Sequence, residues 1–280
     1  MTLHKGIRRS EVVVVRDGNA TRQTDDVVIE EPLEIRVAGE SLATTMRTPG
    51  EDRFLAVGFL FAEGVLRNRD DVGSVRHCGR MDDPRYGNTI DVAAGPGVSL
   101  DVEILMRTKR VGLTQSACGI CGRDNIDDLL ARMPKLTSNA QIEARLLLRV
   151  PELLADKQPN FARTGGLHAA CAIAGDGQVL AHAEDIGRHN AVDKVVGKLL
   201  LAGALPRDDS RDNAVSILAV SGRASFEIVQ KAAMAGFGAV ASVSAPSSLA
   251  IDTARAAGVT LAAFVREGRF TLYTYEERVV

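Results

Sequence analysis

Residues 214–243 read AVSILAVSGRASFEIVQKAAMAGFGAVASV, and this stretch decides the fold class. The apolar run over Ala214–Val220 is typical of a strand buried on both faces. A Ser221-Gly222-Arg223 turn follows, and helical periodicity then covers Ala224–Ala235 until a glycine ends it. Gly238–Val243 resembles a second buried strand. The order strand, helix, strand is typical of an α/β fold.

The segments on either side extend this pattern. Leu167–Ala174 and Val179–Glu184 predict a hairpin around an Asp-Gly turn, and Asn190–Ala202 has helical periodicity. Ser247–Ala257 predicts a further helix, and a last hairpin follows it, with its turn at Glu267-Gly268. We therefore expect an α/β sheet with helices on both faces.

The N-terminal third predicts strands and one helix. Glu11–Arg16, Val27–Ile29 and Leu33–Val37 have strand character. Thr48-Pro49-Gly50-Glu51 has the spacing of a capping box with proline at the first helical position, so we expect a helix to begin there. The resulting expectation is a smaller β-rich domain over residues 1–110, a mobile loop over 111–123 and a larger α/β domain over 124–280.

Composition excludes several classes of protein. The 280 residues carry a formal charge of −2, which gives no global basic surface for nucleic acid. Four cysteines do not make a disulfide scaffold, and no apolar run approaches the roughly 18 residues of a membrane span. We expect a cytoplasmic protein that binds no nucleic acid and no membrane, and whose thiols stay reduced.

The loop Ser116-Ala117-Cys118-Gly119-Ile120-Cys121-Gly122-Arg123 carries a Cys-X-X-Cys pair. The thiolate is the reactive form of cysteine, and Arg123 would favour it. The motif alone fits four interpretations equally: a redox pair, half of a zinc site, a sulfur carrier, or incidental cysteines. Cys171 lies inside a predicted strand, and we expect it to be buried and inert.

His182-Ala183-Glu184 matches the H-x-E element of zinc deaminases. In those enzymes the Cys-X-X-Cys pair follows this element and a proline precedes its first cysteine, whereas here Cys118 comes earlier in the chain and follows Ala117. Deaminase chemistry is therefore disfavoured.

Three predicted turns that follow strands carry small, polar or basic residues: Glu184–Asn190, the turn at Ser221, and the turn that starts at Ser244. The amide groups at a helix N-terminus bind phosphate, and ligands of open α/β sheets lie beyond the carboxyl ends of the strands. If the strands are parallel, the turns share one rim, where Arg188 and Arg223 would contact an anion. His189 would be a ligand contact, a proton carrier or a capping residue, and ordinary helix capping is the alternative interpretation of all three turns. The sequence contains neither a Walker lysine nor a G-x-G-x-x-G pattern, so a nucleotide hydrolase and a dinucleotide dehydrogenase are not predicted.

The order of these motifs resembles the FdhD family, the formate dehydrogenase accessory sulfurtransferases. The resemblance runs from about Glu31 to Tyr275 and rests on four stretches. They are Thr164-Gly165-Gly166-Leu167-His168, Glu184-Asp185-Ile186-Gly187-Arg188-His189-Asn190-Ala191-Val192-Asp193-Lys194, Ser221-Gly222-Arg223, and Cys118-Gly119-Ile120-Cys121-Gly122.

The resemblance implies a sulfurtransferase with a cytidine deaminase-like sheet that acts as a cytoplasmic homodimer. It would accept sulfur from a cysteine desulfurase as a persulfide on Cys118, with Cys121 assisting. It would then transfer that sulfur to the bis-molybdopterin guanine dinucleotide cofactor of formate dehydrogenase, with no permanently bound metal of its own. The cofactor-binding residues implied or inferred are Arg188, His189, Ser221, Gly222, Arg223, Ser244, Phe264, Val265, Arg266, Glu267, Gly268 and Arg269.

Two alternatives of other classes stay open. A molybdenum-cofactor-binding chaperone would shield and insert the cofactor without moving sulfur. A zinc or redox protein would use the Cys118–Cys121 pair for metal or disulfide chemistry.

Overall fold

A computed structural model describes residues 6–79, 82, 86–100, 113–114, 133–137, 141–205 and 216–280 of the chain. Its larger part is a six-stranded sheet in the order β13-β12-β11-β10-β8-β9. β10 pairs in parallel with β11, and β11 with β12, whereas β8 is antiparallel to both β10 and β9. Strands β9, β10, β11 and β12 therefore run in one direction. Their bounds are β8 His168–Ile173, β9 Val179–Asp185, β10 Ile217–Val220, β11 Ala239–Ser242, β12 Thr260–Arg266 and β13 Arg269–Thr274.

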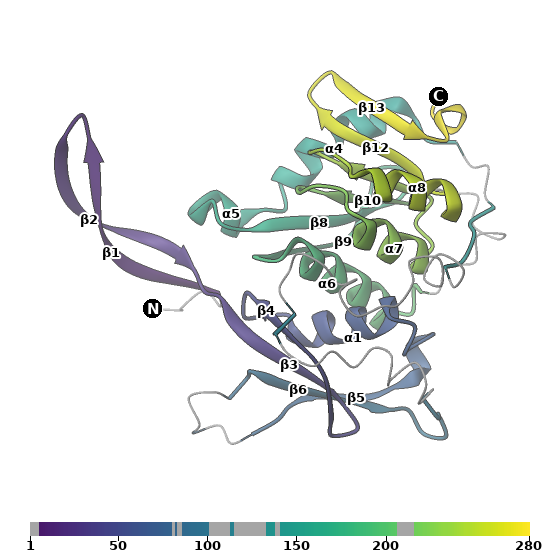
Figure 1. Cartoon of the computed structure of the whole chain (residues 1–280), viewed down its shortest axis with the longest axis horizontal. Helices are drawn as coiled ribbons and strands as arrows, with labels where there is room; N and C mark the ends of the chain where they lie inside the picture. Colours follow the sequence, from purple (N-terminus) through teal and green to yellow (C-terminus); the bar gives the residue numbers. More distant parts are fainter. Residues whose placement is uncertain are drawn as a thin grey trace.

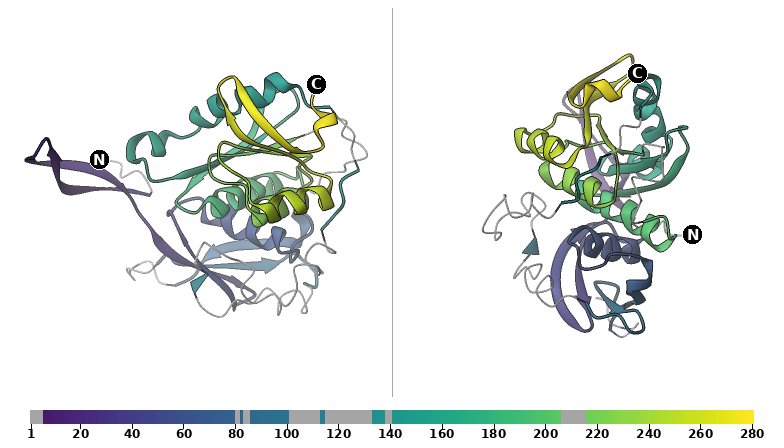
Figure 2. Two further views of the ribbon diagram at one scale, coloured as in Figure 1. Left: turned by 45° about the horizontal axis from the view of Figure 1, so that its top comes forward. Right: turned by 90° about the vertical axis from the view of Figure 1, so that its right-hand side faces the viewer.

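Helices cover both faces of this sheet, as predicted (Figure 2). Leu218 and Val220 of β10 pack in one core cluster with the helices α6, α7 and α8, whereas Ile217 and Ala219 pack in a second cluster with α4. This alternation is the two-residue period of a strand buried on both faces. The helices are α4 Ala144–Ala155, α5 Pro159–Thr164, α6 Arg188–Leu201, α7 Phe226–Met234 and α8 Ser248–Ala257.

The smaller part is a five-stranded sheet in the order β5-β6-β3-β4-β7, with α1 packed against it. The apolar residues of β3 alternate with polar ones, and Leu33, Ile35 and Val37 point into the core that α1 shares. The bounds are β3 Glu31–Val37, β4 Glu40–Arg47, α1 Asp52–Ala62, β5 Val72–His77, β6 Thr89–Ala94 and β7 Leu113–Thr114, and short 3₁₀ turns occupy Arg69–Asp71 and Glu276–Arg278.

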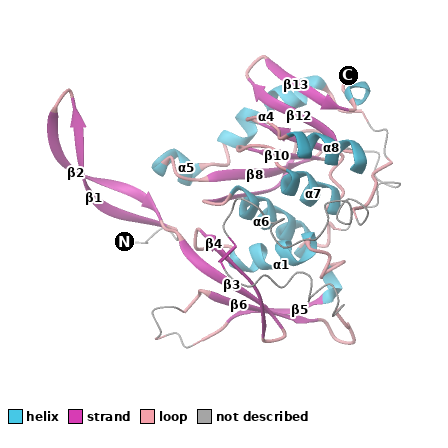
Figure 3. Ribbon diagram, in the orientation of Figure 1, coloured by secondary structure: helices cyan, strands magenta, loops and turns pink. Residues whose placement is uncertain are grey.

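The two parts meet where α1 crosses α6 (Figure 3). The crossing needs two glycines: a Cβ on Gly58 would lie 1.8 Å from the Asp193 carbonyl oxygen, and one on Gly197 would lie 2.0 Å from that of Phe54. The backbones of the two helices therefore touch directly.

An antiparallel ribbon of β1 (Ile7–Arg16) and β2 (Asn19–Val28) projects away from the rest of the molecule (Figure 1). The sequence predicts the second half of β1, over Glu11–Arg16, but only the last two residues of β2. Most of β2 is polar and exposed, so it lacks the alternation of apolar residues that marks a half-buried strand. Its base is held by an ion pair between Arg163 and Asp26 at 2.6 Å.

The predicted capping box at Thr48 is wrong. Helix α1 begins at Asp52, and its N-cap is Glu51 in the left-handed region at φ 60°. Thr48 instead forms hydrogen bonds at the end of β9 in the six-stranded sheet. Its hydroxyl accepts a hydrogen bond from the Ile186 amide at 3.2 Å, and its own amide donates to Asp185 at 3.3 Å. A tertiary contact has replaced the local cap.

The strands and helices predicted after residue 164 are confirmed to within a few residues at their ends. The predicted loop over 111–123 and the domain boundary at its end fall outside the described residues, apart from the backbone of β7. Among the described residues, the longest apolar helices are too short to span a membrane.

Candidate functional site at the sheet rim

The predicted anion-binding turns lie along one rim of the six-stranded sheet. Because β9, β10, β11 and β12 run in the same direction, their carboxyl ends share that edge. His168, at the start of the antiparallel β8, pairs with Asp185 at the end of β9 and so lies there too. The fold therefore brings together the predicted turns after β9, β10 and β11 and the hairpin at the end of β12.

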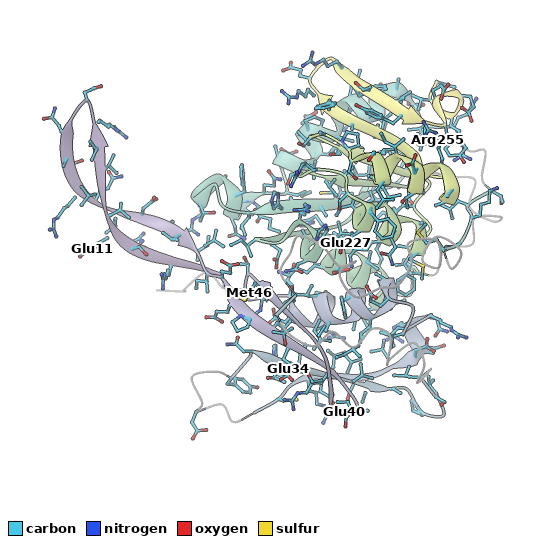
Figure 4. The ribbon with its side chains drawn as sticks, viewed as in Figure 1. Glu11, Glu34, Glu40, Met46, Glu227 and Arg255 are labelled. Carbon is cyan, nitrogen blue, oxygen red and sulfur yellow. The ribbon has the colours of Figure 1, made fainter. Side chains whose placement is uncertain are left out.

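The first turn is held by a buried carboxylate. Asp185 is completely buried, and its oxygens receive Lys194 Nζ at 2.6 Å, the Gly187 amide at 2.8 Å and Asn190 Nδ2 at 3.0 Å. Asn190 also donates to the carbonyl of Met46, which Figure 4 labels on β4, at 2.8 Å. Asp185 thus fixes the start of α6 and connects it to the N-terminal sheet.

A second buried ion pair lies further along α6. Asp193 contacts Lys231 of α7 at 2.6 Å, and both side chains are almost fully buried. Burial is the largest influence on Asp193 and raises its pKa to about 6, against the attraction of Lys231. Asp185 and Asp193 are therefore both interior ion-pair partners.

Arg188 lies on the rim at the start of α6, and no described residue forms an ion pair with it. Its Nε is buried, and no described residue accepts a hydrogen bond from it. Burial lowers its pKa most, and the nearby cation Arg223 lowers it further. Gly222 allows this packing, because a Cβ there would lie 3.3 Å from His168 Nδ1 and 3.4 Å from Arg188 Cδ. Two guanidinium groups near a half-buried histidine make an environment that favours an anion.

His189 is not simply a neighbour of Arg188. Its Nδ1 lies 3.0 Å from a carboxylate oxygen of Glu227, and its Nε2 lies 3.1 Å from Ser225 Oγ. Sequence reasoning missed Ser225 and Glu227. They stand 36 and 38 positions after His189, and only the crossing of α6 and α7 brings them together.

The other predicted binding residues on the rim differ in their hydrogen bonds and in how far their side chains are exposed. Ser221 Oγ accepts the Ala169 amide at 2.9 Å, and the Ser244 carbonyl accepts the Phe264 amide at 3.1 Å. Phe264 has φ 51° at an irregularity of the β12–β13 pairing and is partly exposed, whereas Val265 is buried. The side chain of Val265 therefore packs in the core, and the tip Arg266-Glu267-Gly268-Arg269 forms the turn of the hairpin.

Cys118 and Cys121 lie outside the described residues. The last residue of β7, Thr114, pairs with Thr45 of β4 and stands four positions before Cys118 in the sequence. Cys171 is buried as predicted, and burial raises its pKa to about 12, which keeps this thiol unreactive.

The deaminase-like stretch holds no metal site among the described residues. Glu184 accepts the amides of Asn160 and Phe161, at 3.1 and 2.7 Å, and thereby caps α5. His182 lies on the exposed face of β9, and its backbone carbonyl accepts a hydrogen bond from Lys198. The H-x-E carboxylate therefore has a structural role here.

Comparisons with known proteins agree on one family. Residues 28–280 match the family described as FdhD/NarQ. A sulfur carrier protein FdhD of Anaeromyxobacter dehalogenans is 53% identical over 96% of this chain and 93% of the relative. That of Streptomyces avermitilis is 43% identical over 97% of this chain and 95% of its own length. A crystal structure from Desulfotalea psychrophila, described as a formate dehydrogenase accessory protein, is 22% identical with a TM-score of 0.73 and covers 98% of this chain and 100% of its own. That last likeness shows a shared fold.

Proposed function

The chain belongs to the FdhD/NarQ family, and on this premise we propose that it is a sulfur carrier in the maturation of formate dehydrogenase. The observation that carries the proposal is the match, over nearly the whole chain, to relatives that are named sulfur carrier proteins. The accessory role comes from the structural neighbour, which is described by that role.

We propose that Cys118 bears the sulfur as a persulfide and that Cys121 assists its exchange. A cysteine desulfurase supplies the sulfur. The terminal sulfane sulfur of the persulfide would then be transferred to the acceptor, a bis-molybdopterin guanine dinucleotide. As the S–S bond breaks, Cys118 would be left as a thiolate, and the acceptor's metal would supply the two electrons that reduce the transferred sulfur to sulfide. A mobile carrier loop suits this role because donor and acceptor are different partners.

The rim of the six-stranded sheet is the proposed seat of the acceptor. Arg188, Arg223 and the arginines of the β12–β13 tip would contact its phosphate groups, and the fixed sheet would hold the acceptor while sulfur is delivered. The rim also lies close to β7, because Asn190 at the start of α6 contacts both Thr45 and Met46 of β4. We further propose that the protein acts as a cytoplasmic homodimer and that its six-stranded sheet is related to the sheet of cytidine deaminases.

The first test is sulfur loading. The reduced protein is incubated with a cysteine desulfurase and L-cysteine, and peptides are examined by mass spectrometry. We expect sulfur on the peptide with Cys118 and Cys121, removable by reductant, lost in Cys118→Ala and partly kept in Cys121→Ala. Cys78→Ala is the matched control, because Cys78 is a half-buried thiol of the N-terminal sheet. Full loading of Cys118→Ala would overturn the assignment.

The second test separates a carrier from a chaperone. Cells with Cys118→Ser should fail to produce active formate dehydrogenase, whereas a protein that only shields and inserts the cofactor would tolerate this change. Stoichiometric zinc that disappears with the same substitution would favour a metal site on the pair.

A further inference from the structure

The contact between α6 and α7 at the rim places a serine, a histidine and a glutamate in series. Ser225 Oγ lies 3.1 Å from His189 Nε2, and His189 Nδ1 lies 3.0 Å from Glu227 Oε2. The histidine therefore has one nitrogen on a hydroxyl and the other on a carboxylate. This is the arrangement by which a general base activates a hydroxyl nucleophile while a third group orients the base.

Ser225 is placed differently from an ordinary capping serine. It is the N-cap residue of α7, but its side chain forms no capping hydrogen bond. Ser247 occupies the same position at α8 and does cap, because its hydroxyl accepts the Ala250 amide at 3.2 Å. The Ser225 hydroxyl is turned to His189 instead, which leaves the amides of the first turn of α7 without a side-chain cap. Such amides are suited to stabilise developing negative charge.

The protonation state of His189 suits a base. The side chain is 12% exposed, and burial is the main cause that lowers its pKa, while Glu227 opposes that shift. Near neutral pH the ring is therefore neutral. The carboxylate of Glu227 selects the tautomer with the proton on Nδ1, because a carboxylate accepts and does not donate. Nε2 is then free to accept the proton of the Ser225 hydroxyl.

The surroundings of Ser225 determine what class of substrate would suit it. Arg223 lies two positions before it, and Arg188 precedes His189 directly. Within the described part of the chain, neither guanidinium group has a carboxylate partner within ion-pair distance, and the Nε of Arg188 is buried without a partner. Glu227 attracts Arg188 electrostatically but does not lie within ion-pair distance of it. Two adjacent guanidinium groups without an ion-pair partner among the described residues fit the oxygens of a phosphoryl group.

We propose that Ser225, His189 and Glu227 form a nucleophilic triad that acts on a phosphoric ester or anhydride bound between Arg188 and Arg223. Ser225 Oγ bonds to phosphorus as its proton moves to His189 Nε2, and Glu227 stabilises the resulting imidazolium. The bond from phosphorus to the leaving group breaks, and His189 returns the proton to that group. Water then hydrolyses the phosphoserine with His189 again as the base. This activity uses no cysteine, but it shares Arg188 and Arg223 with the proposed seat of the acceptor, so the phosphoric ester and the acceptor would compete for this part of the rim. The labelling of Ser225 needs no sulfur on Cys118, so the activity can fail or stand apart from the sulfur-carrier proposal.

The test uses a fluorophosphonate probe on the full-length protein, with the labelled residue located by peptide mass spectrometry. Ser225 Oγ would displace fluoride from phosphorus, and we expect a stoichiometric adduct on Ser225. His189→Gln should slow labelling by about 100-fold or more, because it removes the general base. Glu227→Gln should slow it too. Ser247→Ala is the control, and its labelling should equal that of the unchanged protein.

The pH profile gives a second readout. The charged or titratable groups that act on His189 are Glu227 and Lys231 of α7, Arg188 on its own helix and His168 of β8. The labelling rate should rise with pH as His189 loses its proton, and it should reach its plateau at a pH below the ordinary pKa of histidine. Folded protein that gains no adduct on Ser225, or one that labels Ser247 at the same rate, would overturn the proposal.

Discussion

The first turn and the middle of α6 serve different purposes, and the sequence motif Glu184–Lys194 includes residues of both. At the rim, Arg188 and His189 present a guanidinium group and an imidazole beside α7 and the turn after β10. Further along, Lys194 and Gly197 are buried, and they join the six-stranded sheet to the N-terminal part. The motif therefore cannot be interpreted as a binding sequence as a whole. Arg188 and His189 lie at the rim, whereas Lys194 helps to hold the two parts of the molecule together.

This difference predicts where substitutions act. Changes at the junction of α1 and α6 should lower the free energy of unfolding without a direct effect on rim chemistry. Changes at the rim should do the reverse.

Lys194→Met should give the largest loss of stability. It leaves the fully buried Asp185 carboxylate without its cation, and breaking a buried ion pair from one side costs about 3–5 kcal/mol. Lys198→Met is the matched control one turn further along. Its partner Glu51 is exposed, so the loss should stay below about 1 kcal/mol. Urea unfolding measures both, and equal losses would contradict a special role for the buried pair.

Gly197→Ala should follow, at about 3 kcal/mol, because the added methyl group would overlap the Phe54 carbonyl at 2.0 Å and force α1 away from α6. Gly18→Ala is its control. Gly18 has φ 81° and open space around it, so only backbone strain of about 1 kcal/mol is expected. The same unfolding experiment would refute the tight crossing if Gly18→Ala proved the more harmful of the two.

Much of the fold can be predicted from the sequence because its signals are local. Each strand and helix after residue 164 has its own periodicity and its own glycine or turn, and the direction of the strands then places the predicted turns on one rim. The start of α1 could not be predicted, because Thr48 bonds to Ile186 and Asp185, which are far away in the sequence.

The candidate site likewise contains residues that the sequence predicts and residues that it does not. Arg188 and Arg223 could be found from the composition of single turns. The contact of His189 with Ser225 and Glu227 depends on how α6 and α7 cross, and no spacing in the sequence encodes that crossing. The ion pair between Asp193 and Lys231 was missed for the same reason.

The Asp193 pair should make stability depend on pH. Its pKa is about 6 in the folded protein and near the ordinary value of 3.8 when unfolded, so the folded state binds the proton more tightly. This contribution is fully present below the unfolded pKa and is lost as pH rises towards and through 6. The variant Asp193→Asn cannot ionise at this position. Its free energy of unfolding, relative to that of the unchanged protein, should therefore rise by about 2–3 kcal/mol from pH 4 to pH 7. Denaturant unfolding at the two pH values measures the change, and a pH-independent difference would place the pKa of Asp193 elsewhere.

The smallest expected effect separates the two serines of the rim that occupy N-cap positions, Ser225 and Ser247. Ser247→Ala removes a side-chain cap from α8 and should cost about 1 kcal/mol of stability. Ser225→Ala removes no cap, because that hydroxyl contacts His189, and so its cost should be clearly smaller. Thermal unfolding of both variants gives the comparison. If Ser225→Ala destabilised the protein as much as Ser247→Ala does, the hydroxyl of Ser225 would cap α7. The contact with His189 would then be a by-product of capping. The smaller loss, together with loss of reactivity towards the fluorophosphonate, would instead assign this serine to the chemistry of the rim.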